Sequence, residues 1–470
     1  MQIRPLETKE LPEALPLKKL VGPSFIILGL GLGSGEIILW PYLSSNFGLG
    51  IIWGAVLGLT FQFFMNMEIE RYALAHGESI FVGFARKLKW LPIWFMLSTF
   101  LPWVWPGIAA SSAKFVGSLF GLEDTKFLAI GFLVLMGIIL TFGPVLYKTV
   151  ETLQKTLIMI GVPSIFVLSI VLAGKADWTA LSKGIVGIGE GYNFLPPGIA
   201  IASFLGALAY AGAGGNLNLA QSAYVREKGY GMGKYTGRIT SLLTGKAENV
   251  RLTGSKFEPT LENFVKFKVW WTNVNIEHFL VFWLTGSITI LLLALLAYTT
   301  THGMPGTSND INFVFLEAQV IGERLFPFAG TFFLLVASLT LFGTQLTVFD
   351  ATSRILSENF ALALNEKVSE KDIPKVYYIM LWIQILAGIA IFMFGFTQPL
   401  VLLTLAAVLN AFAMFVHVGL TLWVNLTLLH KQIRPNAFRV SAMVLAFVFY
   451  GSFSIYTIAT ELGKIIAKFS

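Results

Sequence analysis

An acidic residue directly follows a run of alternating glycines in the first apolar stretch of the chain. Residues 22–43 read GPSFIILGLGLGSGEIILWPYL, and the acid is Glu36. The glycines before it are Gly29, Gly31, Gly33 and Gly35. Each glycine costs about 1 kcal/mol of helix propensity relative to alanine, so we expect the helix to be interrupted here. A carboxylate at a helix interruption inside a membrane is a candidate binding-site residue.

A second glycine-rich stretch, at residues 197–225, ends in amide side chains. Its glycines are Gly212, Gly214 and Gly215, and its amides are Asn216 and Asn218. If the two interruptions face each other, they offer only oxygen atoms to a ligand, with Glu36 and Asn216 as candidate metal ligands. Oxygen ligands suit magnesium, calcium or manganese better than soft metals. A single carboxylate competes weakly with the water of a small dication, so the expected ligand is a hydrated or partly hydrated ion.

The composition places these residues in a membrane protein. Of the 470 residues, 55% are hydrophobic and 13% are charged, whereas soluble domains carry about 25% charged residues. The mean hydropathy is +0.73. The absence of cysteine excludes disulfides, thiolate metal sites and thiol catalysis. Apolar runs predict eleven spans, at about residues 22–43, 49–73, 91–120, 127–147, 152–174, 197–225, 276–300, 326–350, 375–396, 399–429 and 438–460.

The basic residues lie mostly on one side of the predicted spans. Residues 1–21 are polar and lack the pattern of a signal peptide, so we expect a cytosolic tail. With this tail inside, the inner segments carry most of the lysines and arginines, in agreement with the positive-inside rule. We therefore expect a multi-pass protein of the plasma (inner) membrane, with its N-terminus in the cytoplasm and its C-terminus outside. The net charge of +7 follows from this topology and requires no nucleic-acid partner.

Spans one and six occupy matching positions in two sets of five spans. The first set covers residues 22–174 and the second covers residues 197–429, while residues 438–460 add an eleventh span. Span one would run outward and span six inward, so the sets are expected to be inverted repeats. Discontinuous helices at matching places of inverted repeats are the signature of the LeuT architecture, an all-α membrane fold. Within the second set we expect an inner loop at residues 226–270 and an outer loop at residues 301–323.

The two interruptions also resemble those of a known family. Gly22-Pro23 and Gly33-Ser34-Gly35-Glu36 resemble the first span of the natural-resistance-associated macrophage protein (Nramp) transporters, whose interruption carries Asp-Pro-Gly-Asn. Ala213-Gly214-Gly215-Asn216-Leu217 is similar to the family's Met-Pro-His-Asn-Leu. The resemblance covers spans one to ten. It implies the LeuT fold and, in most members, proton-linked uptake of divalent transition metals.

The chain departs from the family pattern at the ligands themselves. Glu36 takes the place of the family's metal-binding Asn, Gly33 that of its metal-binding Asp, and Ala213 that of its Met ligand. Ser111 and Lys114 stand where the family has an acidic pair associated with proton movement. Divergent members that also have alanine at the methionine position transport magnesium. The resemblance and the oxygen ligands together predict a secondary transporter or uniporter for a hard divalent cation, of the Mg2+ and Mn2+ class, with weak or absent proton coupling.

Several other polar residues inside spans have more than one interpretation. Lys114 could neutralise Glu36, replace a coupling ion, bind an anionic substrate, or extend to the interface near the outer end of span three. Gln345 is, with Ser111 and Lys114, a candidate coupling or gating residue. Asn410 lies mid-span in span ten, where it could face the substrate or bond to a neighbouring helix.

Helical spacing predicts two local ion pairs. Asp350 and Arg354 are four residues apart at the inner end of span eight, and Glu68 and Arg71 are three apart near the inner face. We interpret the first as a local pair and the second as a gate or a structural pair.

The same residues allow a structural interpretation and a second function. Glycines at this spacing also permit close helix packing, and Glu36 could pair with a lysine or with an amide at the start of a half-helix. With the same fold, the chain could carry a small organic solute, an amine or amino acid, with Trp40 or Tyr210 adding cation–π attraction. No constellation typical of an enzyme occurs, so we expect no catalysis and no cofactor. The expected partners are membrane lipids and the transported ion or small molecule, and we expect a monomer.

Overall fold

The chain folds into long helices with almost no sheet. The computed structural model describes residues 4–20, 22–142, 146–237, 251–364 and 370–469. In these ranges the strands are β1 (Glu7–Thr8) and β2 (Ser255–Lys256), which pair in parallel with Glu7 opposite Ser255. The predicted all-α membrane fold is therefore confirmed.

The first predicted repeat contains two interrupted or bent crossings. The first crossing consists of α1, the π-helical turn η2 and α2, and the third consists of α5 and α6 with Pro106 between them. Proline has no N–H and restricts the residue before it, so a single helix does not continue through this point. The elements are α1 (Pro23–Gly31), η2 (Ser34–Leu39), α2 (Trp40–Phe47), η3 (Leu49–Ile51), α3 (Trp53–His76), α4 (Ile80–Lys87), α5 (Leu91–Trp103), α6 (Gly107–Leu119), α7 (Lys126–Phe142), α8 (Leu146–Leu172) and α9 (Lys175–Gly184).

The second predicted repeat again begins with a split crossing, α10 and α11. The elements of this part and the rest of the chain are α10 (Ile201–Ala209), η4 (Gly215–Leu219), α11 (Ala220–Lys228), η5 (Gly231–Tyr235), α12 (Leu261–His278), η6 (Phe279–Leu284), α13 (Thr285–Thr301), α14 (Asn312–Arg324), α15 (Pro327–Leu364), α16 (Ile373–Met393), α17 (Pro399–Leu428), η9 (Lys431–Ile433) and α18 (Ala437–Phe469). α12 begins inside the expected inner loop, because Thr260 caps it by accepting a hydrogen bond from the Asn263 N–H at 3.3 Å. α14 lies in the expected outer loop.

The described helices account for the crossings that the hydropathy predicts. Nine helical runs are long and apolar enough to span a membrane, and α7 is a shorter apolar helix. The remaining crossing is divided between α10 and α11, each of nine residues. A multi-pass membrane protein is therefore the architecture of this chain.

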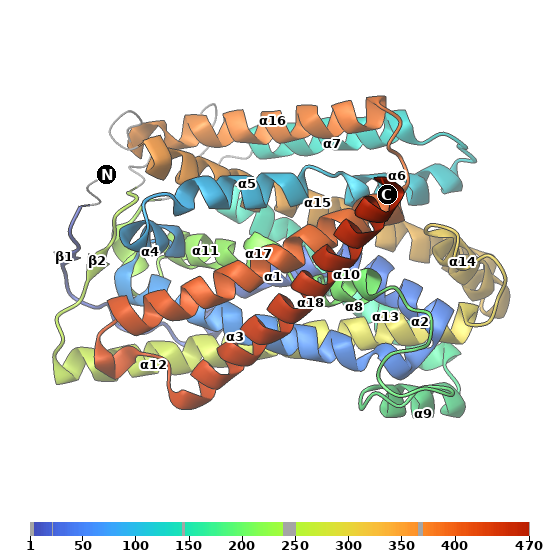
Figure 1. Cartoon of the computed structure of the whole chain (residues 1–470), viewed down its shortest axis with the longest axis horizontal. Coiled ribbons are helices and arrows are strands. Elements are labelled where there is room, and N and C mark those ends of the chain that lie inside the picture. The colour runs from blue at the N-terminus through green and yellow to red at the C-terminus, as the bar shows by residue number, and fades with distance from the viewer. Residues whose placement is uncertain (1–3, 21, 143–145, 238–250, 365–369, 470) are drawn as a thin grey trace.

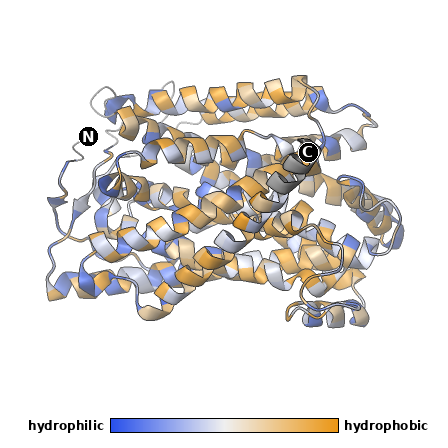
Figure 2. Cartoon of the chain, viewed as in Figure 1, coloured by the Kyte–Doolittle hydropathy of each residue, from blue (hydrophilic) through white to orange (hydrophobic). Residues whose placement is uncertain are grey.

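The two ends of the helix bundle carry different elements (Figure 1). β1, β2 and α4 gather at one end, which we call the tail end, and α9 and α14 lie at the other, which we call the far end. Apolar residues colour most of the bundle, and hydrophilic residues are frequent at the tail end and in the loops of the far end (Figure 2). The interrupted helices α1 and α10 lie among the other helices, while α18 crosses the outside of the bundle (Figure 1).

Candidate functional site

The two interrupted helices touch each other through their main chains. A β-carbon added to Gly31 would lie 3.0 Å from the Gly212 Cα, and one added to Gly35 would lie 1.6 Å from the Tyr210 carbonyl oxygen. Any side chain at Gly35 would therefore overlap the backbone of the other helix. The glycines permit a close approach of the two interruptions, so the packing and the interruption interpretations both hold here.

The first interruption is held open by α15. α1 ends at Gly31, and Gly33 has φ −123° and ψ −119°, which is not helical. Thr344 Oγ1 on α15 donates to the Gly29 carbonyl at 3.0 Å, and a β-carbon on Gly33 would lie 2.4 Å from Thr344 Cγ2. The hydroxyl satisfies a carbonyl that the interrupted helix leaves without its usual donor.

The second interruption requires glycine for its backbone conformation. Gly214 and Gly215 have φ values of 76° and 54°, in the left-handed region that favours glycine. Gln62 on α3 bridges the gap, because its Nε2 donates to the Ala209 carbonyl at 3.0 Å and its Oε1 accepts from the Gly214 N–H at 3.2 Å. His417 Nε2 lies 3.1 Å from the Gly215 carbonyl. The polar neighbours thus fix the gap in one shape.

Glu36 is completely buried, and neither carboxylate oxygen has a hydrogen-bond partner among the described residues. The carboxylate points toward the start of α13, where its Oε1 would lie 3.8 Å from a β-carbon added to Gly286. Leu28 and Leu59 lie within 3.4 Å of the same point, so this side of the carboxylate is apolar. An ionised carboxylate in such surroundings is costly unless a charge is paired with it. In this buried setting the group therefore needs a proton or a bound cation.

The three candidate amides use their donors and leave their acceptors free. Asn216 Nδ2 donates to the hydroxyls of Ser98 at 2.8 Å and Thr99 at 3.0 Å. Asn410 Nδ2 donates to the Tyr210 hydroxyl at 2.9 Å, and Asn218 Nδ2 lies 3.4 Å from the Gly215 carbonyl.

The Oδ1 atom of each of these amides is buried and has no partner in the part of the chain that the structure describes. Buried acceptors without donors are uncommon in proteins. Unpaired oxygens of this kind can ligate a hard cation.

The side chains of the predicted site turn toward different neighbours. Glu36 faces α13, whereas Asn216 bonds to α5 and Asn410 packs against Gly215, whose added β-carbon would lie 1.8 Å from the Asn410 Oδ1. Ala213, which directly precedes Gly214, is 1% exposed. The structure thus brings the two interruptions together, with Glu36 and Asn216 oriented to different helices.

The candidate coupling residues lie in other settings. Lys114 Nζ pairs with Asp310 Oδ2 at 2.7 Å, and both side chains are partly exposed. Among the interpretations given for Lys114, this partly exposed ion pair agrees with the one that puts the side chain near the outer end of span three. Ser111 Oγ donates to the Gly107 carbonyl of its own helix at 2.9 Å. Gln345 is buried on α15, next to the residue that supports the first interruption.

Three supporting residues had no role in the sequence interpretation. Gln62, Thr344 and His417 each bond to main-chain groups at an interruption. A signal for them existed, because each is a polar residue inside an apolar span. Sequence alone does not show which of many such residues reaches the interruptions.

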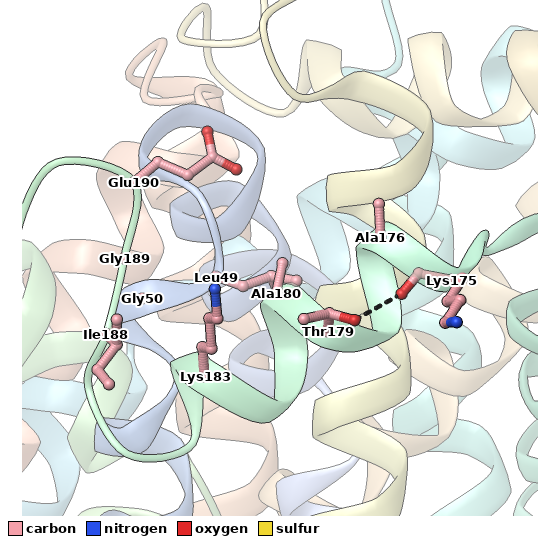
Figure 3. Close-up of a pocket in the computed structure, with 10 residues that line it drawn as sticks. All are labelled: Leu49, Gly50, Lys175, Ala176, Thr179, Ala180, Lys183, Ile188, Gly189 and Glu190. Atoms are coloured by element: carbon pink, nitrogen blue, oxygen red, sulfur yellow. Dashed lines mark hydrogen bonds between the residues drawn. The ribbon is translucent and has the colours of Figure 1, made fainter.

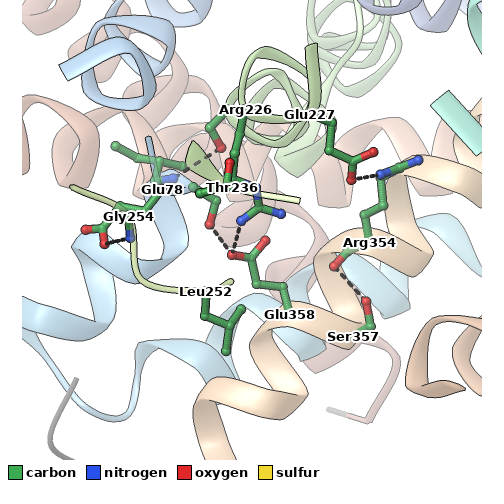
Figure 4. Close-up of polar contacts among 12 residues, drawn as sticks. Glu78, Arg226, Glu227, Thr236, Leu252, Gly254, Arg354, Ser357 and Glu358 are labelled. Atoms are coloured by element: carbon green, nitrogen blue, oxygen red, sulfur yellow. Dashed lines mark hydrogen bonds and ion pairs between the residues drawn. The ribbon is translucent and has the colours of Figure 1, made fainter. Parts of the chain in front are cut away.

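Charged residues of α11 and α15 contact one another at the tail end (Figure 4). The predicted pair of Asp350 and Arg354 is confirmed, at 2.9 Å. Arg354 also pairs with Glu227 of α11, and Arg226 pairs with Glu358 at 3.2 Å. These contacts join α11 to α15.

The other predicted pair also forms at this end. Arg71 Nε lies 2.8 Å from Glu68 Oε2, and Arg439 of α18 reaches Glu68 Oε1 at 3.3 Å. Both partners of the predicted pair are nearly buried.

A cavity of about 660 Å3 lies at the far end, between α9 and the start of the second crossing (Figure 3). Lys175, Lys183 and Glu190 supply its charged groups. Its lining residues include none of the candidate site residues.

Comparisons with known proteins bear on the fold. No family model matches the sequence, and no curated protein sequence matches it. Crystal structures of two variants of the Eremococcus coleocola manganese transporter are similar, with TM-scores of 0.69 and 0.68. In both cases the identity is 13%, and the alignment covers 98% of this chain and 91% of that chain.

Two further solved structures are similar to different degrees. The same manganese transporter in complex with an aromatic bis-isothiourea substituted compound gives a TM-score of 0.65. Mhp1, a nucleobase-cation-symport-1 family transporter, gives 0.47 at 12% identity over 95% of both chains, too low to support an inference. At 13% identity the likeness to the manganese transporter shows the fold. The chain therefore has the fold of that transporter, the LeuT fold with interrupted first and sixth crossings.

Proposed function

We propose that the protein is a secondary transporter or uniporter that moves a hard divalent cation, of the Mg2+ and Mn2+ class, by alternating access. One observation carries the proposal: the two interruptions touch, and beside them lie a buried carboxylate and three buried amide oxygens that have no hydrogen-bond partner among the described residues. The fold shared with a manganese transporter supports it. Interrupted helices that meet near the middle of the membrane are where transporters of this architecture bind substrates.

The chemistry of the proposed site favours a hard ion. Its unpaired groups are carboxylate and amide oxygens, and such ligands suit magnesium and manganese. Because Glu36 and Asn216 face different helices, we propose that the ion keeps part of its water shell when these groups hold it. The residues at the family's proton positions, Ser111 and Lys114, offer no carboxylate, so we propose weak or absent coupling to protons through the third crossing.

Transport also needs a path from the interruptions to the water on each side of the membrane. The ion pairs of Arg354 and Arg226 hold α11 against α15 at the tail end. We propose that this end faces the cytoplasm and that release requires α11 to part from α15. The chain has no cysteine, so single cysteines introduced at Lys19 or at Lys175 would report the side of each end by their reaction with an impermeant reagent.

The central test is ion influx into proteoliposomes, measured for Mn2+ and Mg2+ separately. Glu36→Gln keeps the shape of the side chain and removes its charge, and we expect a loss of at least tenfold in apparent affinity, about 1.4 kcal/mol. Glu317→Gln is the matched control, because Glu317 is also a buried carboxylate, on α14. Wild-type vesicles that move neither ion, or a Glu36→Gln variant that moves them as well as the wild type, would contradict the proposal.

A second candidate function is transport of a small organic solute, an amine or amino acid. Tyr210, at the second interruption, stacks on Trp103 with ring centroids 5.3 Å apart, which gives this region an aromatic wall. Thermal stabilisation distinguishes the two functions. Shifts produced by millimolar Mn2+ or Mg2+ support the first, and shifts produced only by amines or amino acids support the second.

A further inference from the structure

A second group of buried acids lies on the tail-end side, outside the site described above. Glu277 on α12 and Glu70 on α3 are 6% and 1% exposed. Neither has a basic partner within 4.0 Å in the described ranges, although the buried acids Glu68, Glu227 and Glu358 each pair with an arginine. The unpaired acids therefore need another explanation.

Glu277 belongs to a three-residue chain of hydrogen bonds. Ser24 Oγ, in the first turn of α1, lies 2.5 Å from Glu277 Oε2 and 2.8 Å from His278 Nδ1. Ser24 and His278 are fully buried, and the imidazole is stacked on Phe63 and Phe282. Glu277 Oε1 and His278 Nε2 have no partner among the described residues.

The serine hydroxyl limits how protons can be arranged in this chain. It has one hydrogen, so it donates to one neighbour and accepts from the other. Either Glu277 is ionised and His278 donates from Nδ1, or Glu277 is a carboxylic acid and His278 accepts at Nδ1. When Glu277 is ionised and the imidazole of His278 is neutral, the group has a charge of −1. One added proton, on Glu277 or on His278, makes the group neutral. Because an unpaired charge in this dry setting is costly, the neutral group is favoured.

The charged residues around Glu277 do not neutralise it in place of the proton. Lys155 and Lys228 act electrostatically on Glu277, but each lies within 3.0 Å of Glu151 Oε1, whose charge opposes theirs. Glu70 supplies no positive charge, and its Oε2 accepts from Gln221 Nε2 at 3.2 Å. Elements around α12 also carry titratable groups: Tyr230 near both acids, Lys18 and Lys19 on η1 (Leu17–Lys19), Lys431 on η9, and, on α3, the paired Glu68 and Arg71 together with Tyr72 and His76.

We propose that Glu277, Ser24 and His278 form a proton-binding site that holds one proton while the start of α1 stays hydrogen-bonded to the end of α12, and releases it to water when the two separate. α1 is divided from the rest of the first crossing by the interruption at Gly33, so it can move as a unit. Its separation would remove Ser24 from the group and let water reach Glu277. This proton site lies at α1 and α12, away from Ser111 and Lys114 on α6.

The first test measures the separation of α1 and α12 as a function of pH. Spin labels at Phe25→Cys, a partly exposed position of α1, and at Lys268→Cys, an exposed position of α12, are the only thiol labels in a chain without cysteine. Between pH 7 and 9 we expect the ratio of separated to packed molecules to rise by up to tenfold per pH unit, because the packed state binds one more proton. The rise should disappear in Glu277→Gln and persist in the control Glu317→Gln. A ratio independent of pH in a wild type that does separate, or an unchanged slope in Glu277→Gln, would overturn the proposal.

The second test measures folded stability against pH, and it applies even if α1 and α12 of the wild type do not separate. In the unfolded chain Glu has a pKa of about 4.3 and His one of about 6.5, so above pH 7 the unfolded group has lost the proton that the folded group keeps. Folded stability should therefore fall as pH rises from 7 to 9, and fall more for the wild type than for Glu277→Gln in parallel melting curves. Parallel curves for the two proteins would refute the site. The separation of α1 from α12 is a step that rests on the proposed transport function. Both measurements are made without substrate, so the proton-site proposal and the transport proposal can fail separately.

Discussion

The contact between the two interruptions predicts a large effect of a small change, Gly35→Ala. The added β-carbon would lie 1.6 Å from the Tyr210 carbonyl oxygen, and real contacts of this kind are essentially never under 3.0 Å. The two backbones would have to move apart by the difference. Overpacking a well-filled interior costs about 1–3 kcal/mol. Here the obstacle is main chain on both sides, so we expect a loss near 3 kcal/mol together with loss of transport.

The assay for Gly35→Ala is thermal unfolding in detergent, followed by Mn2+ influx in proteoliposomes. For a chain of this length, 3 kcal/mol corresponds to a decrease in melting temperature of roughly 3 °C or more. Gly131→Ala on α7 is the matched control, since a β-carbon there has nothing within 4 Å. Alanine at that position should be neutral or add up to about 1 kcal/mol through helix propensity. If Gly35→Ala melts and transports like Gly131→Ala, the interruptions do not touch and the reasoning about the site is wrong.

Two further substitutions test the assignments made to charged residues. Arg354→Met should destabilise the protein by about 3–5 kcal/mol, because it leaves the carboxylates of Asp350 and Glu227 buried without their cation. Melting curves should show this loss. The triple variant that adds Asp350→Asn and Glu227→Gln should recover most of the lost stability. Lys114→Ala should lower the free energy of unfolding by less than about 1 kcal/mol and leave Mn2+ influx unchanged, because Lys114 pairs with Asp310 at a partly exposed position. A transport defect in this variant would instead support a coupling role for Lys114.

The sequence predicted the crossings and the two interruptions for simple physical reasons. Long apolar runs identify membrane helices, because every backbone polar group in lipid must be bonded within the helix. Closely spaced glycines predict where the first and sixth crossings are interrupted, at Gly33 and at Gly214 and Gly215. The pair of Asp350 and Arg354 follows from helical spacing in the same way. All of these features depend on residues close together in the chain.

Tertiary structure alone decided which distant residues meet at those places. Lys114 finds Asp310, 196 residues away, and Gln62 reaches across to Ala209, 147 residues away. The direction of Glu36, toward Gly286, depends on how the first and seventh crossings pack. A local pattern fixes where a helix ends and which face is polar, but contacts between crossings depend on the packing of the whole bundle. For this reason the positions of the two interruptions followed from the sequence, while the partners of the side chains beside them did not.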